Sequence, residues 1–198
     1  MARPQEYNRE DVLKSAMEVF RRQGYGATSI PNLVDATGLQ PGSLYAAFGN
    51  KKGLLMEALE SYSQQNLADM DASLTAHDSA LESLFGFLQQ TSKTCSSESG
   101  EHGCLIMNTF LEMSSQDEDV CALLQKLISN IELRLTAQTK LAVEQGEISN
   151  DQDPEALAKF VLNSIWGLRI MGMRQKNTDT KVVVKQLIAH LKSCQPML

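Results

Sequence analysis

The stretch between residues 28 and 52 carries two helix signals separated by a tight turn. Pro31 can occupy the first turn of one helix, where backbone N–H groups lack partners inside the helix. Gly38 is predicted to end that helix, because the left-handed conformation needed there suits glycine best. Pro41 stands where a second helix would begin, since its φ is preset and it has no donor to lose. A helix, a glycine-containing turn and a second helix form the helix-turn-helix pattern.

The second of these helices is predicted to present small side chains on its outer face. Leu44, Tyr45 and Phe48 recur at helical spacing, so this face is expected to pack inward. Gln40 and Ser43 would stay outside. A helix this short, with an outer face this small, can lie in the major groove of DNA. The stretch therefore predicts a DNA-reading element.

The same residues resemble the DNA-binding signature of the TetR/AcrR family of bacterial one-component transcription regulators. The matching positions in chain order are Thr28-Ser29, Gly38, Gly42-Ser43-Leu44-Tyr45, Phe48, Lys51 and Leu54-Leu55. The resemblance covers about residues 9–60 well, and beyond them it is one of architecture. Val34, Pro41 and Ala47 depart from the family pattern. These departures leave the family intact and bear on which bases are read.

Long segments with helical periodicity and few helix breakers predict an all-α protein. Only 5 prolines and 12 glycines occur in 198 residues. We expect an N-terminal three-helix DNA-binding head over residues 1–50, which contains the helix-turn-helix and starts with a helix over 9–23. The resemblance implies that 51–198 form a helical ligand-binding and dimerisation body. The helices expected in the body span about 51–74, 79–94, 104–113, 117–145, 154–174 and 180–192.

A net charge of −6 opposes binding to nucleic acid, but the charge is unevenly distributed. Residues 1–56 carry seven Lys or Arg against five Asp or Glu, whereas the remainder carries eleven against nineteen. The predicted head is therefore mildly basic and the body acidic. Such an asymmetry would orient the head toward a phosphate surface.

The sequence gives little support for a membrane protein, a secreted protein or an enzyme. No run of about 18 apolar residues occurs, and the first ten residues lack the apolar segment of a signal peptide. Four cysteines fit neither a zinc pattern nor a disulfide framework, so we expect a cytoplasmic protein without a metal or cofactor. Common catalytic motifs are absent. The alternative is a small-molecule or thiol enzyme, with Glu101-His102 beside Cys104, whose helix-turn-helix is only a packing motif.

Lys51 and Lys52 open a long helix with positive charges, which is unfavourable near a helix N-terminus. A DNA phosphate there would relieve this conflict, and two solvated surface lysines are the alternative. The resemblance implies that contacts to DNA divide into phosphate anchors and base readers. The anchors would be Thr28, Tyr45 and Lys51, and the readers would be Gln40, Pro41 and Ser43.

Aromatic and thioether side chains gather in the predicted body and could line a cavity, although plain core packing is the alternative. By resemblance, the body encloses an effector pocket. The residues expected to line it are Phe85, Leu88, Cys104, Met107, Phe110, Leu111, Ile128, Trp166 and Ile170. A helix N-terminus at Cys104 would lower the pKa of its thiol and make it reactive, whereas an inert buried cysteine is the alternative.

The last two predicted helices have broad apolar faces, and the resemblance implies that they form a homodimer interface. The same resemblance implies a ligand-responsive transcriptional regulator that acts as a repressor. We therefore expect a homodimer that binds a near-palindromic operator in double-stranded DNA. A small-molecule effector would release it.

Overall fold

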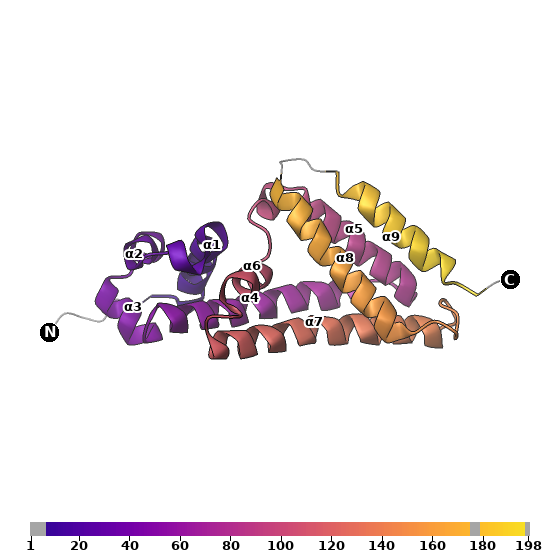
Figure 1. Cartoon of the computed structure of the whole chain (residues 1–198), viewed down its shortest axis with the longest axis horizontal. Helices are drawn as coiled ribbons and strands as arrows, with labels where there is room; N and C mark the ends of the chain where they lie inside the picture. Colours follow the sequence, from indigo (N-terminus) through magenta and orange to yellow (C-terminus); the bar gives the residue numbers. More distant parts are fainter. Residues whose placement is uncertain (1–6, 175–178, 197–198) are drawn as a thin grey trace. The chain divides into compact units, whose positions relative to one another are not determined.

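The computed structural model describes residues 7–174 and 179–196. Over these residues the chain is helical apart from its loops, and no strand is present (Figure 1). The elements are α1 (Arg9–Ala27), α2 (Ile30–Thr37), α3 (Pro41–Phe48), α4 (Lys51–Leu74), α5 (Ala80–Cys95), the 3₁₀ helix η1 (Glu98–Gly100), α6 (Leu105–Met113), α7 (Glu118–Glu144), α8 (Pro154–Arg174) and α9 (Lys181–Ser193). The all-α prediction is confirmed. Every helix expected in the body begins and ends within one residue of its predicted position.

Two compact units divide the chain. Unit 1 comprises Met1–Gln65 and Leu105–Leu124, and unit 2 comprises Asn66–Cys104 and Gln125–Leu198. Helix α6 and the start of α7 thus belong to the same unit as α1, α2 and α3, although they are distant in sequence. The units do not coincide with the predicted domains, 1–50 and 51–198, because α6 packs against α1. Sequence order alone carries no signal for such a contact.

Helix α1 organises unit 1. Its buried side chains are Val12, Leu13, Ala16 and Phe20. The first stretch of α1 ends before Gly24, as predicted, because Gly24 is non-helical with φ 79°, and a further short helical stretch follows to Ala27. Arg9 ties the start of α1 to α4, with its Nη2 atom 2.6 Å from an oxygen of Glu57. The Arg9 guanidinium also lies 4.4 Å from the centre of the Phe48 ring.

Helix α6 is strongly apolar in composition, yet it is buried along one face only. Its buried residues are Leu105, Ile106, Thr109 and Met113. Leu111 lies on the other face and is 72% exposed. A nine-residue helix packed against α1 can cover only the side chains that face its neighbour. The apolar composition of this segment therefore overstates its burial.

Unit 2 is built around one apolar cluster, to which α5, α8 and α9 contribute most of the residues. These three helices run side by side in Figure 1 and contact one another. Leu84, Leu88, Leu168 and Leu191 are each 0% exposed within this cluster. A buried hydroxyl group of Thr180 joins the start of α9 to α5. Among the described residues, no helix combines the length and apolar character needed to cross a membrane.

Candidate nucleic-acid interface

Local capping signals define α2, as the sequence predicted. The Ser29 hydroxyl accepts the backbone N–H of Asn32 at 3.3 Å, and the Asn32 side chain accepts the backbone N–H of Ser29 at 2.9 Å. This reciprocal arrangement is a capping box. At the other end Gly38 adopts φ 70°, and its N–H donates to the carbonyl of Val34 at 2.9 Å. The turn between α2 and α3 thus requires the left-handed residue that the sequence supplies.

Helix α3 packs through Leu44 and Phe48, which are 4% and 7% exposed. Gln40, Pro41 and Ser43, the predicted base readers, are all exposed at its N-terminal end. Tyr45 was expected to pack inward with Leu44, but it is 47% exposed. A one-residue step turns a side chain by about 100° around a helix, which carries Tyr45 out of the buried face. Its exposure leaves its hydroxyl accessible to a partner.

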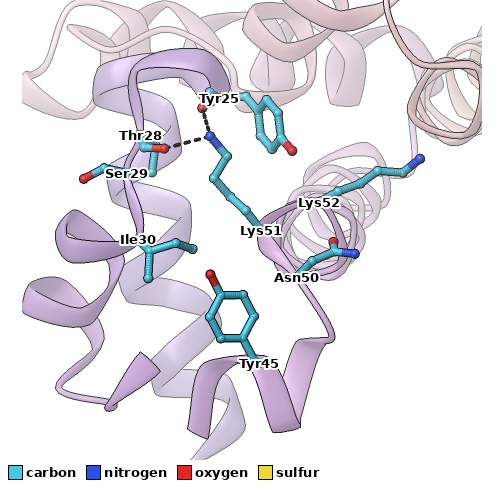
Figure 2. A pocket seen from close by; sticks show the side chains of 8 residues that line it. All are labelled: Tyr25, Thr28, Ser29, Ile30, Tyr45, Asn50, Lys51 and Lys52. Carbon is cyan, nitrogen blue, oxygen red and sulfur yellow. Dashed lines mark hydrogen bonds between the residues drawn. The ribbon is translucent and has the colours of Figure 1, made fainter. Parts of the chain in front are cut away.

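An open pocket of about 490 Å³ lies beside α3. Its lining residues are Tyr25, Thr28, Ser29, Ile30, Tyr45, Asn50, Lys51 and Lys52. Figure 2 shows the Tyr45 hydroxyl directed toward the side of the pocket where Ile30 and Lys51 lie. The N-terminal ends of α2 and α4 border the pocket, and two lysines line it. Helix N-termini and ammonium groups both favour an anion.

Lys51 has a structural role that the sequence did not reveal. Its Nζ atom donates to the carbonyl oxygens of Tyr25 at 2.9 Å and Thr28 at 2.8 Å, as Figure 2 shows. The same atom lies 4.2 Å from the centre of the Tyr25 ring. Lys51 therefore caps the C-terminal end of α1. An ammonium group has three N–H donors, so two are used in this way and one remains for a partner in the pocket.

Thr28 borders the pocket but is buried, with 1% of the residue exposed. Its hydroxyl donates to the carbonyl of Gly24 at 2.6 Å. The side chain predicted to anchor a phosphate thus satisfies the end of α1 instead of facing solvent. Of the three predicted anchors, Tyr45 and Lys51 present polar atoms to the pocket more directly than Thr28 does.

Lys52 also lines the pocket, and its charge is paired. Its Nζ atom lies 2.8 Å from both carboxylate oxygens of Asp117 and 2.8 Å from one oxygen of Asp119. Hydrogen bonds to these two carboxylates raise the pKa of Lys52 to about 12. The bond from Lys52 is also the main reason that the pKa of Asp117 is lowered. Burial raises the pKa of Tyr25, and nearby Asp117 adds to this effect.

The residues predicted to line an effector pocket divide between the two units. Unit 2 contains Phe85, Leu88, Cys104, Ile128, Trp166 and Ile170, and unit 1 contains Met107, Phe110 and Leu111. Phe85 and Leu88 are buried in the apolar cluster of unit 2, as the core-packing alternative expects. Ile170 and Leu111 are 50% and 72% exposed, which differs from the expectation of an enclosed wall. Cys104 directly precedes α6, as predicted, and is 8% exposed.

Comparison with known proteins agrees with this geometry. Residues 12–58 match the family described as bacterial regulatory proteins, tetR family, and residues 80–191 match the tetracyclin repressor-like C-terminal domain. The HTH-type transcriptional repressor ComR of Escherichia coli (strain K12) is 31% identical over 169 residues, which cover 85% of this chain and 80% of ComR.

Solved structures give the same result. The TetR family regulator CifR, as a cysteine mutant complexed with a 26-base-pair double-stranded operator DNA, matches with a TM-score of 0.86 and 29% identity. This match covers 94% of the present chain and 98% of CifR. The reduced form of Escherichia coli NemR has a TM-score of 0.82 at 18% identity, over 96% of this chain and 98% of NemR, and shows a common fold.

These matches favour a regulator over the enzyme considered as the alternative. The first family match falls on the helix-turn-helix and the second on the helices of the body, where the sequence signals predicted each of them. The chain therefore belongs to the TetR family and is a DNA-binding regulator of transcription, a class of protein that acts as dimers on double-stranded operator DNA.

Proposed function

We propose that this protein is a cytoplasmic repressor that a small-molecule effector releases from its operator. One observation carries the DNA-binding part of the proposal. The exposed N-terminal end of α3 and the pocket at the starts of α2 and α4 lie next to each other within unit 1. A surface for reading bases and a seat for an anion are thereby adjacent, as binding in a major groove requires.

The pocket is proposed as the seat of a backbone phosphate, and we call it the phosphate pocket. The remaining donor of Lys51 and the exposed Tyr45 hydroxyl would contact the phosphate oxygens. The N-terminal ends of α2 and α4 add the positive ends of two helix dipoles. Such contacts fix the position of α3 on DNA without reading sequence.

The outer face of α3 is proposed to read bases with small and neutral groups. The Gln40 amide can pair with the major-groove edge of adenine, and the Ser43 hydroxyl can bond to several bases. Pro41 offers only apolar contact, which suits the methyl group of thymine. Since α3 contains no Lys or Arg, guanine is not read from this helix through the bidentate contact that those side chains make.

The effector is proposed to bind the apolar body, where Trp166 packs against the unit 2 cluster and Ile128 is partly buried. Cys104 remains a candidate for direct contact with the effector. The CifR structures are of cysteine mutants, so the thiols of this chain are worth testing first. If Cys104 reacts, a thiol-reactive electrophile will lower operator affinity and Cys104→Ser will abolish this response. A non-covalent effector predicts full induction in Cys104→Ser.

The dimer is proposed to form through α8 and α9. Phe160, Ile170 and Met173 on α8 are 44%, 50% and 45% exposed, and Val182 on α9 is 57% exposed. The Phe160 ring also lies edge-on to the ring of His190 on α9, with 5.0 Å between their centres. Large apolar side chains exposed on two adjacent helices favour coverage by a second copy of the chain.

Selection from random duplexes, followed by footprinting, tests the proposed function. We expect the chain to enrich a near-palindrome whose half-site centres lie about 34–36 Å, or a multiple of this distance, apart. A promoter fusion with the selected sequence should be repressed when the protein is present. Enrichment of a single asymmetric half-site would contradict dimeric binding, and failure to enrich any sequence would contradict specific DNA recognition.

A further inference from the structure

Three carboxylates of unit 1 lie where α6 ends and α7 begins, and they contact the residues around the phosphate pocket. We call Glu112, Asp117 and Asp119 the acidic corner. Glu112 belongs to the last turn of α6, whereas Asp117 precedes α7 and accepts the N–H of Val120 at 3.1 Å. Negative charge beside a seat for phosphate is unfavourable for DNA binding. Each carboxylate of the acidic corner contacts a positively charged or N–H group near the pocket.

Asp117 and Asp119 together accept hydrogen bonds from all three N–H donors of Lys52. Three acceptor oxygens lie at 2.8 Å from its Nζ atom, which matches the three N–H donors of an ammonium group. Lys52 lines the pocket, yet its single positive charge faces two negative ones. It therefore presents neither a free donor nor a net positive charge to a phosphate, in contrast to Lys51.

Glu112 acts through the backbone of segment 25–28, whose residues Tyr25 and Thr28 line the pocket. The interruption at Gly24 leaves the N–H groups of Tyr25 and Gly26 without helical partners, and the Glu112 carboxylate accepts them at 2.8 and 2.7 Å. A Cβ atom at Gly24 would lie 2.8 Å from a Glu112 oxygen, so glycine also provides the room for this contact. Glu112 thus holds the N–H groups of segment 25–28, while Lys51 holds its carbonyls.

We propose that the acidic corner sets the strength of phosphate binding in this pocket. Asp117 and Asp119 withhold Lys52 from the DNA backbone, and Glu112 is a positioning residue that fixes segment 25–28 and, through it, the ammonium group of Lys51. The inference rests on the proposed function, because it takes the pocket as the phosphate seat. It adds that Lys52 would bind a second phosphate if Asp117 and Asp119 did not pair with it.

Releasing Lys52 tests the first half of the proposal. The variant Asp117→Asn/Asp119→Asn removes both charges, and asparagine caps a helix as well as aspartate does. We expect tighter binding to the selected operator and to an unrelated duplex alike, measured by fluorescence anisotropy over a salt series. The salt slope should steepen by about 0.9 for each protomer, the value for one additional phosphate contact. Weaker binding or an unchanged slope would overturn this half.

Removing two negative charges could also strengthen DNA binding through long-range repulsion alone, so Lys52 must be tested directly. In the triple variant Lys52→Met/Asp117→Asn/Asp119→Asn, the gain in slope should disappear. Persistence of the full gain would overturn the proposal. Asp71→Asn is the matched control, because it breaks an exposed ion pair with Arg134 in unit 2 (2.7 Å) and should leave the slope unchanged.

Glu112→Gln tests the second half. A glutamine presents an NH₂ group to one of two N–H donors, so segment 25–28 should lose one bond and shift. We expect the affinity for both duplexes to fall by the same factor, about 2- to 30-fold. Glu147→Gln is the control, since Glu147 accepts the N–H of Leu81 at 2.8 Å in unit 2. If Glu112→Gln binds both duplexes as tightly as wild type, Glu112 has no positioning role.

The failure of this inference differs from the failure of the proposed function. A wild-type protein that binds no duplex overturns both. A wild-type protein that binds its operator, with a salt slope that the corner variants do not change, overturns the inference alone. Thermal unfolding followed by circular dichroism checks that each variant is folded under the conditions of the binding assay.

Discussion

The two compact units join their helices with different chemistry. In unit 1 the bonds around the pocket involve charged groups, such as the ammonium of Lys51 on two carbonyls and the Glu112 carboxylate on two N–H groups. In unit 2 the most deeply buried polar contacts are neutral. Thr180 bonds to the Ser92 hydroxyl at 2.6 Å, and the Gln138 amide bonds to the carbonyl of Ala80 at 2.7 Å.

This difference predicts that substitutions in the two units change different properties of the protein. Neutral bonds buried among apolar side chains respond little to salt, whereas charged groups near solvent are screened by it. Substitutions in the core of unit 2 that leave the dimer intact should therefore change the free energy of unfolding and leave the salt dependence of DNA binding unchanged. Substitutions around the pocket of unit 1 should change DNA binding more than they change the free energy of unfolding.

The largest loss of folding stability is expected for a substitution of Val161, which neighbours Phe160 on α8 but is 0% exposed. Although α8 is expected to contribute to the dimer interface, Val161 and Ile165 both lie in the unit 2 cluster. Val161→Asp would bury an unpaired charge and should lower the free energy of unfolding by about 3–5 kcal/mol. Urea unfolding followed by circular dichroism measures this loss.

Phe160→Asp is the matched variant, because Phe160 is 44% exposed. It should fold as the wild type does and dissociate the dimer in sedimentation experiments. A Phe160→Asp protein that remains dimeric would move the interface away from this face of α8. A Val161→Asp protein with wild-type stability would contradict the core described for unit 2.

Thr180 should give the next largest effect. Its hydroxyl bonds to the hydroxyls of Ser92 and Ser96 and to the carbonyl of Ser92. Thr180→Val keeps the shape and removes these three bonds, which should lower the free energy of unfolding by about 1–3 kcal/mol. The salt slope of operator binding should stay at the wild-type value. A changed slope would break the proposed division between the units.

What the sequence could predict follows the range of the interactions involved. The turn at Gly38 and the start of α3 at Pro41 depend on neighbouring residues, and the structure agrees with the helix-turn-helix that they predict. The bonds that the N–H groups of residues 25 and 26 donate to Glu112 span more than 80 positions, and no local pattern points to them. The signal available was indirect, namely Gly24 followed closely by Gly26 after an otherwise regular helix.

The predicted anchors show the same limit. Lys51 was correctly placed at the start of α4, but its bonds to the carbonyls of residues 25 and 28 depend on how α1 ends. Thr28 matches the family pattern in sequence, whereas its burial follows from the packing of the segment between α1 and α2. Residue type predicted the elements of the interface, and tertiary contacts determined which of their polar atoms remain accessible.

Base reading by α3 should be separable from anchoring. Gln40→Ala should relax the preference for one base pair in each half-site, at a cost of about 1–3 kcal/mol against the preferred sequence. Binding to unrelated duplexes should not change, because Gln40 is exposed and makes no side-chain capping bond. Selection with the variant and with Ser43→Ala measures the preference at each position. Uniform weakening across all sequences would make Gln40 an anchor instead of a reader.

Lys51 should give the opposite pattern. Lys51→Met keeps an unbranched side chain of similar length and removes the ammonium group that lies over the Tyr25 ring. Affinity should fall alike for all sequences, and the salt slope should decrease by about 1 for each protomer. Lys14→Met is the control, since Lys14 is exposed on α1 and does not line the pocket. A Lys51→Met protein with the wild-type slope would restrict Lys51 to capping α1.

The smallest effect concerns pH and the pair formed by Lys52 and Asp117. The pKa of Asp117 is lowered in the folded chain, so the pair contributes stability above the ordinary aspartate pKa of 3.8 and loses it as pH falls through the lowered value. The pKa of Lys52 is raised from 10.5 to about 12, so the contribution is complete below 10.5 and is lost as pH rises through about 12. Solvent screening keeps both changes small, because the two side chains are 30% and 23% exposed.

Melting temperatures measured between about pH 5 and about pH 2 test the acidic side of this prediction. Wild type should lose slightly more stability over this range than Asp117→Asn, which has no carboxylate to protonate at this position. Thr180→Val should follow the wild-type curve with a constant offset, since its neutral hydroxyl contacts do not titrate. Parallel curves for wild type and Asp117→Asn would show that the pair adds nothing to folding, and the role of Asp117 would then be confined to its effect on DNA binding.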